Sequence, residues 1–212
     1  MAEIMLSLQE QKAHNINLVS PTQFVPQIIS SINIARKHGL KIPVVYNTGG
    51  YERVETIKLL HGYADIYLTD IKYFDDSICE KYSHAKDYFL HALNAVKAMI
   101  ESVGECEFDD SGMMRKGVII RHLVLPNLKN DSKKILSVLK DEIDISKVKL
   151  SLMSQFTPDF TEDKFKELKR KITTLEYQSV VDYAYELGFE GYMQDKTSAS
   201  DKFVPEFNIN TL

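Results

Sequence analysis

The sequence has few cysteines, and their scarcity excludes several kinds of site. We expect Cys79 in a helix and Cys106 in a strand, and two thiols cannot form a disulfide framework or complete a four-ligand zinc or iron–sulfur site. The six histidines do not add one, because none forms an HxxxH pair or a CxxC-like group. We therefore expect no metal site built from this chain alone.

Long apolar runs and basic clusters are also absent. No stretch has the unbroken apolar length of a membrane span, and the N-terminus lacks the charged-then-apolar plan of a signal peptide. The formal net charge is -4, and short basic segments such as KELKRK are typical of solvated helix faces. A cytoplasmic protein without nucleic acid or membrane partners is expected.

The common nucleotide and hydrolase signatures are missing as well. There is no GxxxxGK(S/T), no GxGxxG after a strand, no GxSxG and no HExxH. What the chain does have is the composition of a soluble globular protein, with 44% hydrophobic and 26% charged residues among 212. We expect one domain over 1–212.

Apolar segments with strand-like and helix-like periods alternate along the chain. After a helical start around Ile4 and Leu8, the pattern predicts strands at 15–19, 41–47, 66–72, 147–156 and 189–195. Between them it predicts helices at 25–38, 51–60, 75–103, 131–143 and 174–188, whereas 104–126 reads as a hairpin whose second arm is a core strand. The tail at 196–212 is polar and loop-like.

This alternation predicts an α/β fold, either a barrel or an open part of one, because parallel strands are joined by right-handed helical crossovers. The carboxyl ends of such strands form the usual ligand site. The polar residues expected there are Ser20, Thr22, Asn47, Thr48, Asp70, Lys72, Arg121, Ser154 and Gln155. They suit a zwitterionic or anionic small molecule carrying hydroxyl groups, although such residues also commonly end strands without a functional role.

At three places in the chain the pattern leaves alternatives open. Asp70 and Lys72 point to the same side of an extended chain, where Lys72 could form a Schiff base if burial lowered its pKa, or be held protonated by Asp70. Arg121 interrupts an apolar run, so it either faces the barrel interior and meets an anion or sits at the strand end beside solvent. The adjacent Gly49 and Gly50 allow either a close approach to a ligand or a plain tight turn.

Several blocks in order resemble radical S-adenosylmethionine (SAM) proteins, in particular the uncharacterised short-chain branch similar to pyruvate formate-lyase activating enzyme. The blocks are NINLVSPTQFVPQI, PVVYNTGGYERVETIKLL, DIYLTDIKYFDD, GVIIRHLVLPN, LSLMSQFTPDF and EYQSVVDYAYELGFEGYMQD with SASDKFVPEF. The resemblance covers nearly the whole chain. It implies a partial (β/α)6 barrel that binds SAM and a 4Fe-4S cluster and generates a 5′-deoxyadenosyl radical, which abstracts hydrogen from a glycine of a partner enzyme.

The resemblance also implies roles for single residues. Ser20 to Thr22 stand where the family binds the SAM amino group, and Asp70 with Lys72 matches its DxK motif beside the SAM carboxylate. Arg121 matches an arginine that reaches SAM. Asn47 and Thr48 match an acid and a threonine near a monovalent cation, but Asn47 replaces the acid, which puts the cation site in doubt.

The family's CxxxCxxC motif, which holds the cluster, and the first barrel strand are both missing from this sequence. The chain is then expected to be a truncated radical SAM protein that is inactive alone; the other hypotheses are a non-catalytic barrel that serves as a binding or structural module, and a Schiff-base lyase. A glycyl radical enzyme or other protein is the expected partner, and an unpaired edge at 15–19 would favour self-association.

Overall fold

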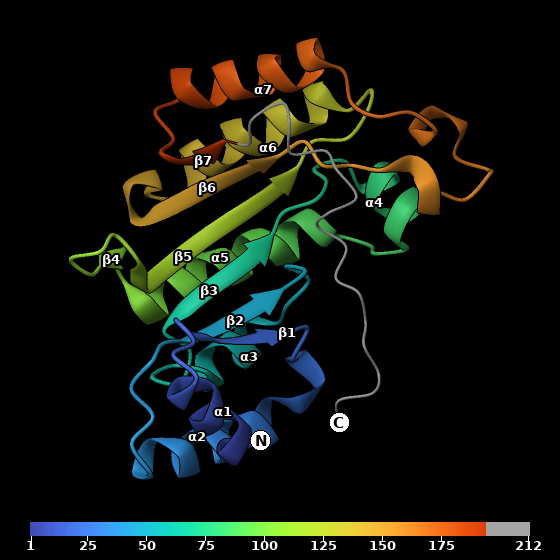
Figure 1. The fold of residues 1–212 in the computed structure, drawn as a ribbon. Coiled ribbons are helices and arrows are strands. Elements are labelled where there is room, and N and C mark those ends of the chain that lie inside the picture. Colours follow the sequence, from blue (N-terminus) through green and yellow to red (C-terminus); the bar gives the residue numbers. More distant parts are fainter. Residues whose placement is uncertain (194–212) are drawn as a thin grey trace.

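An open sheet of parallel strands forms the centre of the molecule (Figure 1). The computed structural model describes residues 1–193, so the loop predicted at 196–212 lies outside the described residues. The parallel strands follow the order β1-β2-β3-β5-β6-β7, and the short β4 pairs antiparallel with β5. Within residues 1–193 the edge strands β1 and β7 do not pair with each other, which confirms the predicted α/β class as a partial, unclosed barrel.

The strands coincide closely with the predicted apolar segments. Strands β1, β2 and β3 span Ile16–Val19, Val44–Thr48 and Ile66–Asp70. The hairpin strands β4 and β5 span Glu107–Phe108 and Met114–Leu123, and β6 and β7 span Val148–Met153 and Gly191–Met193. In the long β5, alternate residues such as Val118 and Ile120 are fully buried, as the period of two requires.

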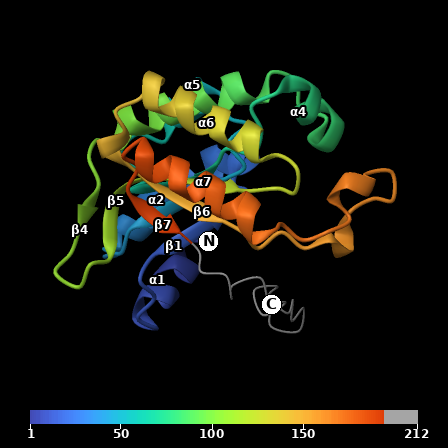
Figure 2. The ribbon, with the colours of Figure 1, turned by 90° about the horizontal axis from the view of Figure 1, so that it is seen from above.

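The helices that connect the parallel strands cover one side of the sheet, and a further helix, α1, precedes β1 (Figure 2). Helix α1 spans Ala2–Glu10, α2 Val25–Lys37 and α3 Val54–Leu59. Helices α5, α6 and α7, which span Tyr88–Val103, Lys129–Glu142 and Thr174–Glu186, lie together on the side opposite the open face (Figure 2). No helix in residues 1–193 has the length and apolar character of a membrane-crossing segment.

Two predictions of local structure are wrong in detail. The helix expected over 75–103 is two helices, α4 at Asp76–Ser83 and α5, because His84 and Asp87 adopt left-handed backbone conformations with φ of 49° and 53°. A left-handed residue cannot continue a right-handed helix. Cys106 lies in the loop just before β4 rather than in the strand, and Cys79 lies in α4 as expected.

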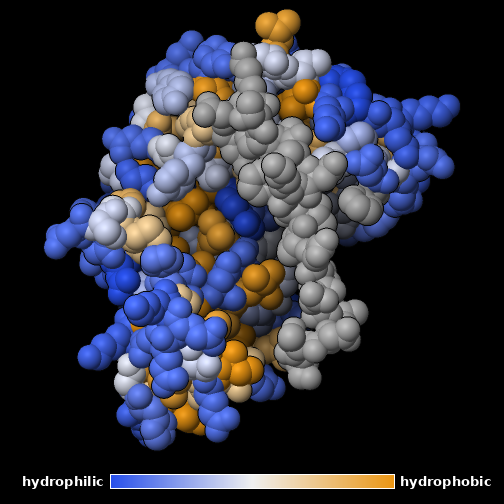
Figure 3. Space-filling view, viewed as in Figure 1, coloured by the Kyte–Doolittle hydropathy of each residue, from blue (hydrophilic) through white to orange (hydrophobic). Residues whose placement is uncertain are grey.

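The buried apolar residues form two clusters. The larger joins the inner faces of α3 to α7 with β2, β3, β5 and β6. The smaller packs α1 and α2 against β1 and β2, through Met5, Ile16, Ile28 and Ile32. The sheet therefore has a thick packed layer behind it, whereas its other face is open in the centre, where apolar and strongly hydrophilic side chains lie side by side (Figure 3).

A buried histidine links the exit of β3 to α6. His122 on β5 is 2% exposed; its Nδ1 lies 2.7 Å from the carbonyl oxygen of Ile71 and its Nε2 lies 2.8 Å from Oγ of Ser132. Burial lowers the pKa of His122 below the ordinary value of 6.5, although its contact with the Ile71 carbonyl acts in the opposite direction. The imidazole is therefore neutral in the folded protein at neutral pH.

We predict that His122 makes the protein less stable in mild acid. Because its pKa is lower folded than unfolded, the unfolded chain binds the extra proton, and stability present above pH 6.5 is lost as the pH falls below that value. The slope from this group cannot exceed about 1.4 kcal/mol per pH unit. Urea unfolding from pH 7.5 to 5 should show a flatter profile for His122→Asn than for wild type. The exposed His14, changed to Asn, serves as control and should leave the profile unchanged.

Candidate functional site

The carboxyl ends of the parallel strands lie along the same edge of the sheet, as predicted, and bring the polar residues into two neighbouring groups. In the pairing register Asp70 lies opposite Arg121, and Asn47 lies opposite Leu68 on the adjacent strand. Ser20 follows β1 in a left-handed conformation with φ of 49°, and its backbone N–H donates to the carbonyl of Asn47. A non-glycine residue in this region indicates a locally constrained chain.

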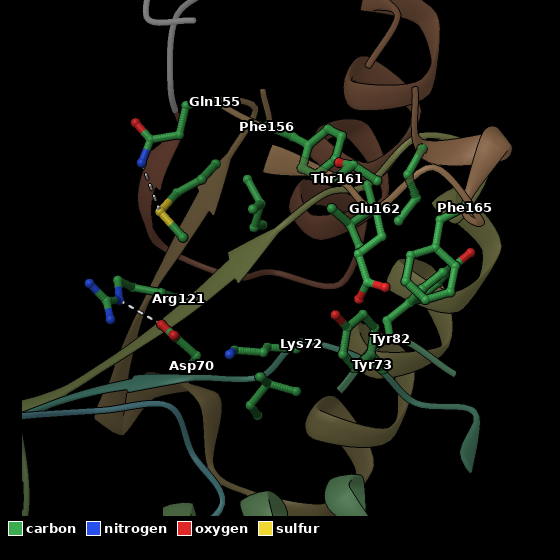
Figure 4. Close-up of a pocket in the computed structure, with 15 residues that line it drawn as sticks. Asp70, Lys72, Tyr73, Tyr82, Arg121, Gln155, Phe156, Thr161, Glu162 and Phe165 are labelled. Atoms are coloured by element: carbon green, nitrogen blue, oxygen red, sulfur yellow. Dashed lines mark hydrogen bonds and ion pairs between the residues drawn. The ribbon is translucent and has the colours of Figure 1, made fainter. Parts of the chain in front are cut away.

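The first group is a charged network on the open face of the sheet. Nε of Arg121 donates to Oδ1 of Asp70 at 2.8 Å (Figure 4). Nη2 of Arg121 donates to Oδ1 of Asn47, also at 2.8 Å. The side chains of Arg121 and Asp70 are 26% and 24% exposed. Of the two predicted alternatives for Arg121, the geometry favours contact with an anion, and that anion is Asp70.

Lys72 lies one residue beyond Ile71, after the end of β3, and does not pair with Asp70. Its side chain is exposed and has no hydrogen bond or ion pair with any residue in the part of the chain that the structure describes. Since Arg121 already neutralises Asp70, the ammonium group of Lys72 remains as an unpaired positive charge. The idea that Asp70 holds Lys72 protonated receives no support from this geometry.

A cavity of about 520 Å³ opens beside this network, which we call the large cavity (Figure 4). Its charged floor consists of Asp70, Lys72 and Arg121, and Gln155 lies at its rim with Nε2 donating to Sδ of Met153 at 3.9 Å. Most of the remaining wall is apolar and aromatic, from Tyr73, Tyr82, Leu123, Leu125, Phe156 and Phe165, and Thr161 and Glu162 add polar groups on that side (Figure 4). The large cavity thus combines a mostly apolar wall with a few polar and charged groups, the usual plan of a small-molecule site.

The turn after β2 is fixed against the end of β3. Gly50 has φ of 86°, and a Cβ there would lie 2.0 Å from the carbonyl oxygen of Asp70. The hydroxyl of Tyr88 lies 2.8 Å from the carbonyl oxygen of Gly49 and 3.0 Å from that of Asp70, and accepts from the backbone N–H of Lys72. Burial, reinforced by the charge of Asp70, raises the pKa of Tyr88, so its hydroxyl stays protonated and able to donate.

The second group centres on Glu52, which the sequence analysis did not identify. Glu52 is 3% exposed, and its Oε1 accepts from Oγ1 of Thr22 at 2.5 Å, Oγ1 of Thr48 at 2.5 Å and Oη of Tyr46 at 3.3 Å. Burial and, to a smaller extent, the charge of Glu52 raise the pKa of Tyr46, whereas its hydrogen bond with Thr22 acts in the opposite direction. Glu52 belongs to no known motif. The one sequence signal near it is the pair Gly49 and Gly50, which allows a turn that returns the chain to Thr48 at the end of β2.

A second cavity, of about 290 Å³, lies beside this group, and we call it the small cavity. Its wall includes Ser20, Thr22, Thr48, Glu52 and Lys72. Lys72 is therefore common to both cavities. The expected site residues divide accordingly: Asp70, Arg121 and Gln155 line the large cavity, Ser20, Thr22 and Thr48 line the small one, and Asn47 connects to the large one through Arg121.

A metal centre is not among the features of the described residues. Residues 1–193 contain no group of three or more His, Cys, Asp or Glu side chains that could hold a metal ion. Cys79 is buried in α4, and Cys106 lies near the opposite end of the strands, with its Sγ 3.4 Å from the carbonyl oxygen of Lys147. The two thiols do not meet at the site.

The geometry defines an open parallel α/β sheet with two cavities at the carboxyl ends of its strands. The crystal structure of a domain of pyruvate-formate lyase-activating enzyme from Bacteroides vulgatus has this fold: the two structures align with a TM-score of 0.58 over 85% of this chain and 98% of that one. The identity is 12%, so the likeness shows the fold alone. It agrees with the partial barrel that the resemblance to radical SAM proteins predicts.

Sequence comparisons add one distant relative. An uncharacterised protein of Methanocaldococcus jannaschii is 30% identical over 173 residues, which are 80% of this chain and 46% of the relative. The chain thus spans about half the length of the curated relative it matches. No protein-family model matches the sequence.

We predict that Gly50→Ala destabilises the protein far more than Gly49→Ala. A Cβ at Gly50 meets the Asp70 carbonyl in a left-handed conformation, whereas at Gly49 the nearest atom is the flexible Lys72 Nζ at 3.9 Å. The strained backbone and the clash together should reduce the free energy of unfolding by at least about 2 kcal/mol, against less than about 0.5 kcal/mol for Gly49→Ala. Urea unfolding of both variants checks this; equal stabilities would mean that the turn does not lie against β3.

Proposed function

We propose that residues 1–212 form the SAM-binding part of a radical SAM protein similar to glycyl-radical-enzyme activating enzymes, and that the chain alone binds SAM without cleaving it. The observation that carries this proposal is the convergence of Asn47, Asp70, Lys72 and Arg121 at the ends of adjacent parallel strands, beside two cavities that share Lys72. The fold shared with an activating-enzyme domain and the ordered sequence blocks support it.

The charges of the site fit the amino-acid end of SAM. Lys72 has an unpaired ammonium group among the described residues, and Arg121 lies nearby with its orientation fixed by Asp70 and Asn47. A carboxylate placed between Lys72 and Arg121 would receive charge-assisted hydrogen bonds from both. Asp70 then acts as a positioning residue, because it holds the guanidinium in place.

The large cavity fits the nucleoside end. Phe156, Phe165 and Tyr82 supply aromatic and apolar surface that a purine ring can pack against. Its volume of about 520 Å³ lies within the range of cavities that hold molecules of this size. Gln155 at the rim adds a polar group able to orient a base or a ribose hydroxyl.

The residues present do not fit an iron–sulfur cluster. Its thiolate ligands are missing from the sequence, and within residues 1–193 no side-chain group could substitute for them. SAM supplies radical chemistry only when it receives an electron from such a cluster. The function that this chain's own residues can carry out is therefore to bind and orient SAM, and a cluster-bearing segment would have to come from elsewhere.

The other enzyme hypothesis, a Schiff-base lyase, has no supporting observation. An amine nucleophile of this kind is activated in an apolar or strongly cationic pocket, whereas the Lys72 side chain is exposed. A glycyl radical enzyme as partner follows from the family resemblance and remains part of the proposal.

We predict that Lys72→Ala weakens SAM binding about 10- to 100-fold, because the change removes one charge-assisted hydrogen bond to the carboxylate. Isothermal titration calorimetry of the purified chain with SAM measures this. Lys58→Ala on the exposed side of α3 is the matched control, since Lys58 is remote from both cavities. An unchanged dissociation constant for Lys72→Ala, or no binding by wild type, would contradict the proposed function.

A chain joined to an upstream CxxxCxxC segment and reconstituted with iron and sulfide should cleave SAM after reduction. We expect 5′-deoxyadenosine from this protein and none from residues 1–212 treated identically, because only the former holds a cluster. Chromatographic assay of the products decides between the two. Absence of 5′-deoxyadenosine from a protein with a spectroscopically intact cluster would contradict the radical SAM assignment.

A further inference from the structure

One oxygen of Glu52 has no partner although the side chain is buried. Oε2 is inaccessible to solvent and makes no hydrogen bond, while the residue as a whole is 3% exposed. The other buried side-chain oxygen without a partner in the described residues is Oγ1 of Thr69, which lines neither cavity. Buried polar atoms are almost always paired, so an exception next to a cavity points to a missing ligand.

All the hydrogen bonds of the Glu52 side chain are made by Oε1. Two hydroxyls, from Thr22 and Thr48, donate to Oε1 at 2.5 Å, which is the length typical of hydrogen bonds to an ionised carboxylate. The Tyr46 hydroxyl donates to the same oxygen. All three hydroxyls therefore bond to Oε1, and Oε2 of the same carboxylate has no hydrogen-bond donor.

Among residues 1–193, no cation forms an ion pair with this carboxylate. None of the ion pairs among residues 1–193 includes Glu52. An unpaired buried charge is strongly unfavourable, and it is kept in native proteins where a ligand or ion compensates it. The natural complement of Oε2 is a positively charged hydrogen-bond donor.

The small cavity supplies the rest of such a site. Glu52 and Lys72 both line it, so it has a negative group and an unpaired positive group, with the hydroxyls of Ser20 and Thr22 also in its wall. A ligand that carries an ammonium and a carboxylate on the same carbon can meet both of these charges. That is the α-amino-acid group.

We propose that Glu52 is the acceptor for the ammonium group of an α-amino-acid moiety bound in the small cavity. The inference rests on the proposed function in that the moiety is the methionine end of SAM, with its nucleoside end in the large cavity. Glu52 is then a binding residue contributed by the loop after β2, and Thr22, Thr48 and Tyr46 are positioning residues that fix the rotation of its carboxylate.

Glu52→Gln tests this inference with little change in shape. The amide oxygen can keep the hydroxyl hydrogen bonds, while the amide NH2 replaces Oε2 with a donor that repels an ammonium group. We expect calorimetry to show SAM binding weakened about 10- to 100-fold. Binding of 5′-methylthioadenosine, which lacks the amino-acid end, should change less than twofold. Glu55→Gln on the exposed side of α3 is the matched control and should leave both affinities unchanged.

A second measurement on the wild-type chain keeps the test decisive if Glu52→Gln folds poorly. In ¹⁵N-labelled protein, SAM and free L-methionine should shift the backbone amides of Thr22, Thr48 and Glu52, and 5′-methylthioadenosine should leave them in place. If SAM binds but neither the substitution nor these amides respond, the inference is wrong and the proposed function stands. If SAM fails to bind but L-methionine shifts these amides, the proposed function is wrong and the inference stands. No response to either ligand overturns both.

A monovalent metal ion is the competing complement of Oε2, and the buffer distinguishes it. The calorimetry is repeated with tetramethylammonium as the only cation besides the ligand. An ammonium acceptor gives the same loss on Glu52→Gln with and without K⁺ or Na⁺. If the loss disappears when these ions are removed, Glu52 holds a metal ion and the inference is overturned.

Discussion

The site depends on the close contact between two backbone segments, the turn after β2 and the end of β3. At Gly50 the two backbone segments approach so closely that no side chain fits between them. The Tyr88 hydroxyl lies within hydrogen-bond distance of a carbonyl on each side of the contact, those of Gly49 and Asp70. The same hydroxyl accepts from the backbone N–H of Lys72. With this contact in place, the chain after β2 turns back and buries Glu52 beside Thr48. Lys72, just after the end of β3, then lies in the walls of both cavities.

Some charged groups around this contact are paired with each other, and others are left without a partner. Asp70 and Arg121 neutralise each other, and Asn47 completes the coordination of the guanidinium. Lys72 and Oε2 of Glu52 have no such partners within residues 1–193. A fold that needed Glu52 only for stability would pair its buried charge, because an isolated charge in a protein interior is unfavourable, whereas the exposed Lys72 can stay unpaired at little cost.

The fold could be predicted largely from the sequence, whereas the site could be predicted only in part. Strand ends follow from apolar segments that stop at polar residues, so Asp70, Asn47 and Thr48 were found by pattern alone. Tyr88 could not be found, because in the sequence it is one more apolar position on the buried face of α5. Glu52 could not be found either, since its burial depends on the left-handed turn at Gly50 and not on any local preference. The break between α4 and α5 depends on His84 and Asp87, whose backbone conformations no periodicity reveals.

The position of Lys72 in the walls of both cavities bears on the shape of the ligand. Two independent ligands would each need the same ammonium group, and the second to bind would lose it. One elongated ligand uses Lys72 once, with an apolar ring on the aromatic side, at Phe156 and Phe165, and a charged end on the side of Glu52. In the proposed complex the carboxylate of that charged end lies between Lys72 and Arg121, and its ammonium group meets Glu52. A nucleoside joined to an amino acid satisfies both requirements, whereas a nucleoside phosphate would leave Oε2 of Glu52 without a partner.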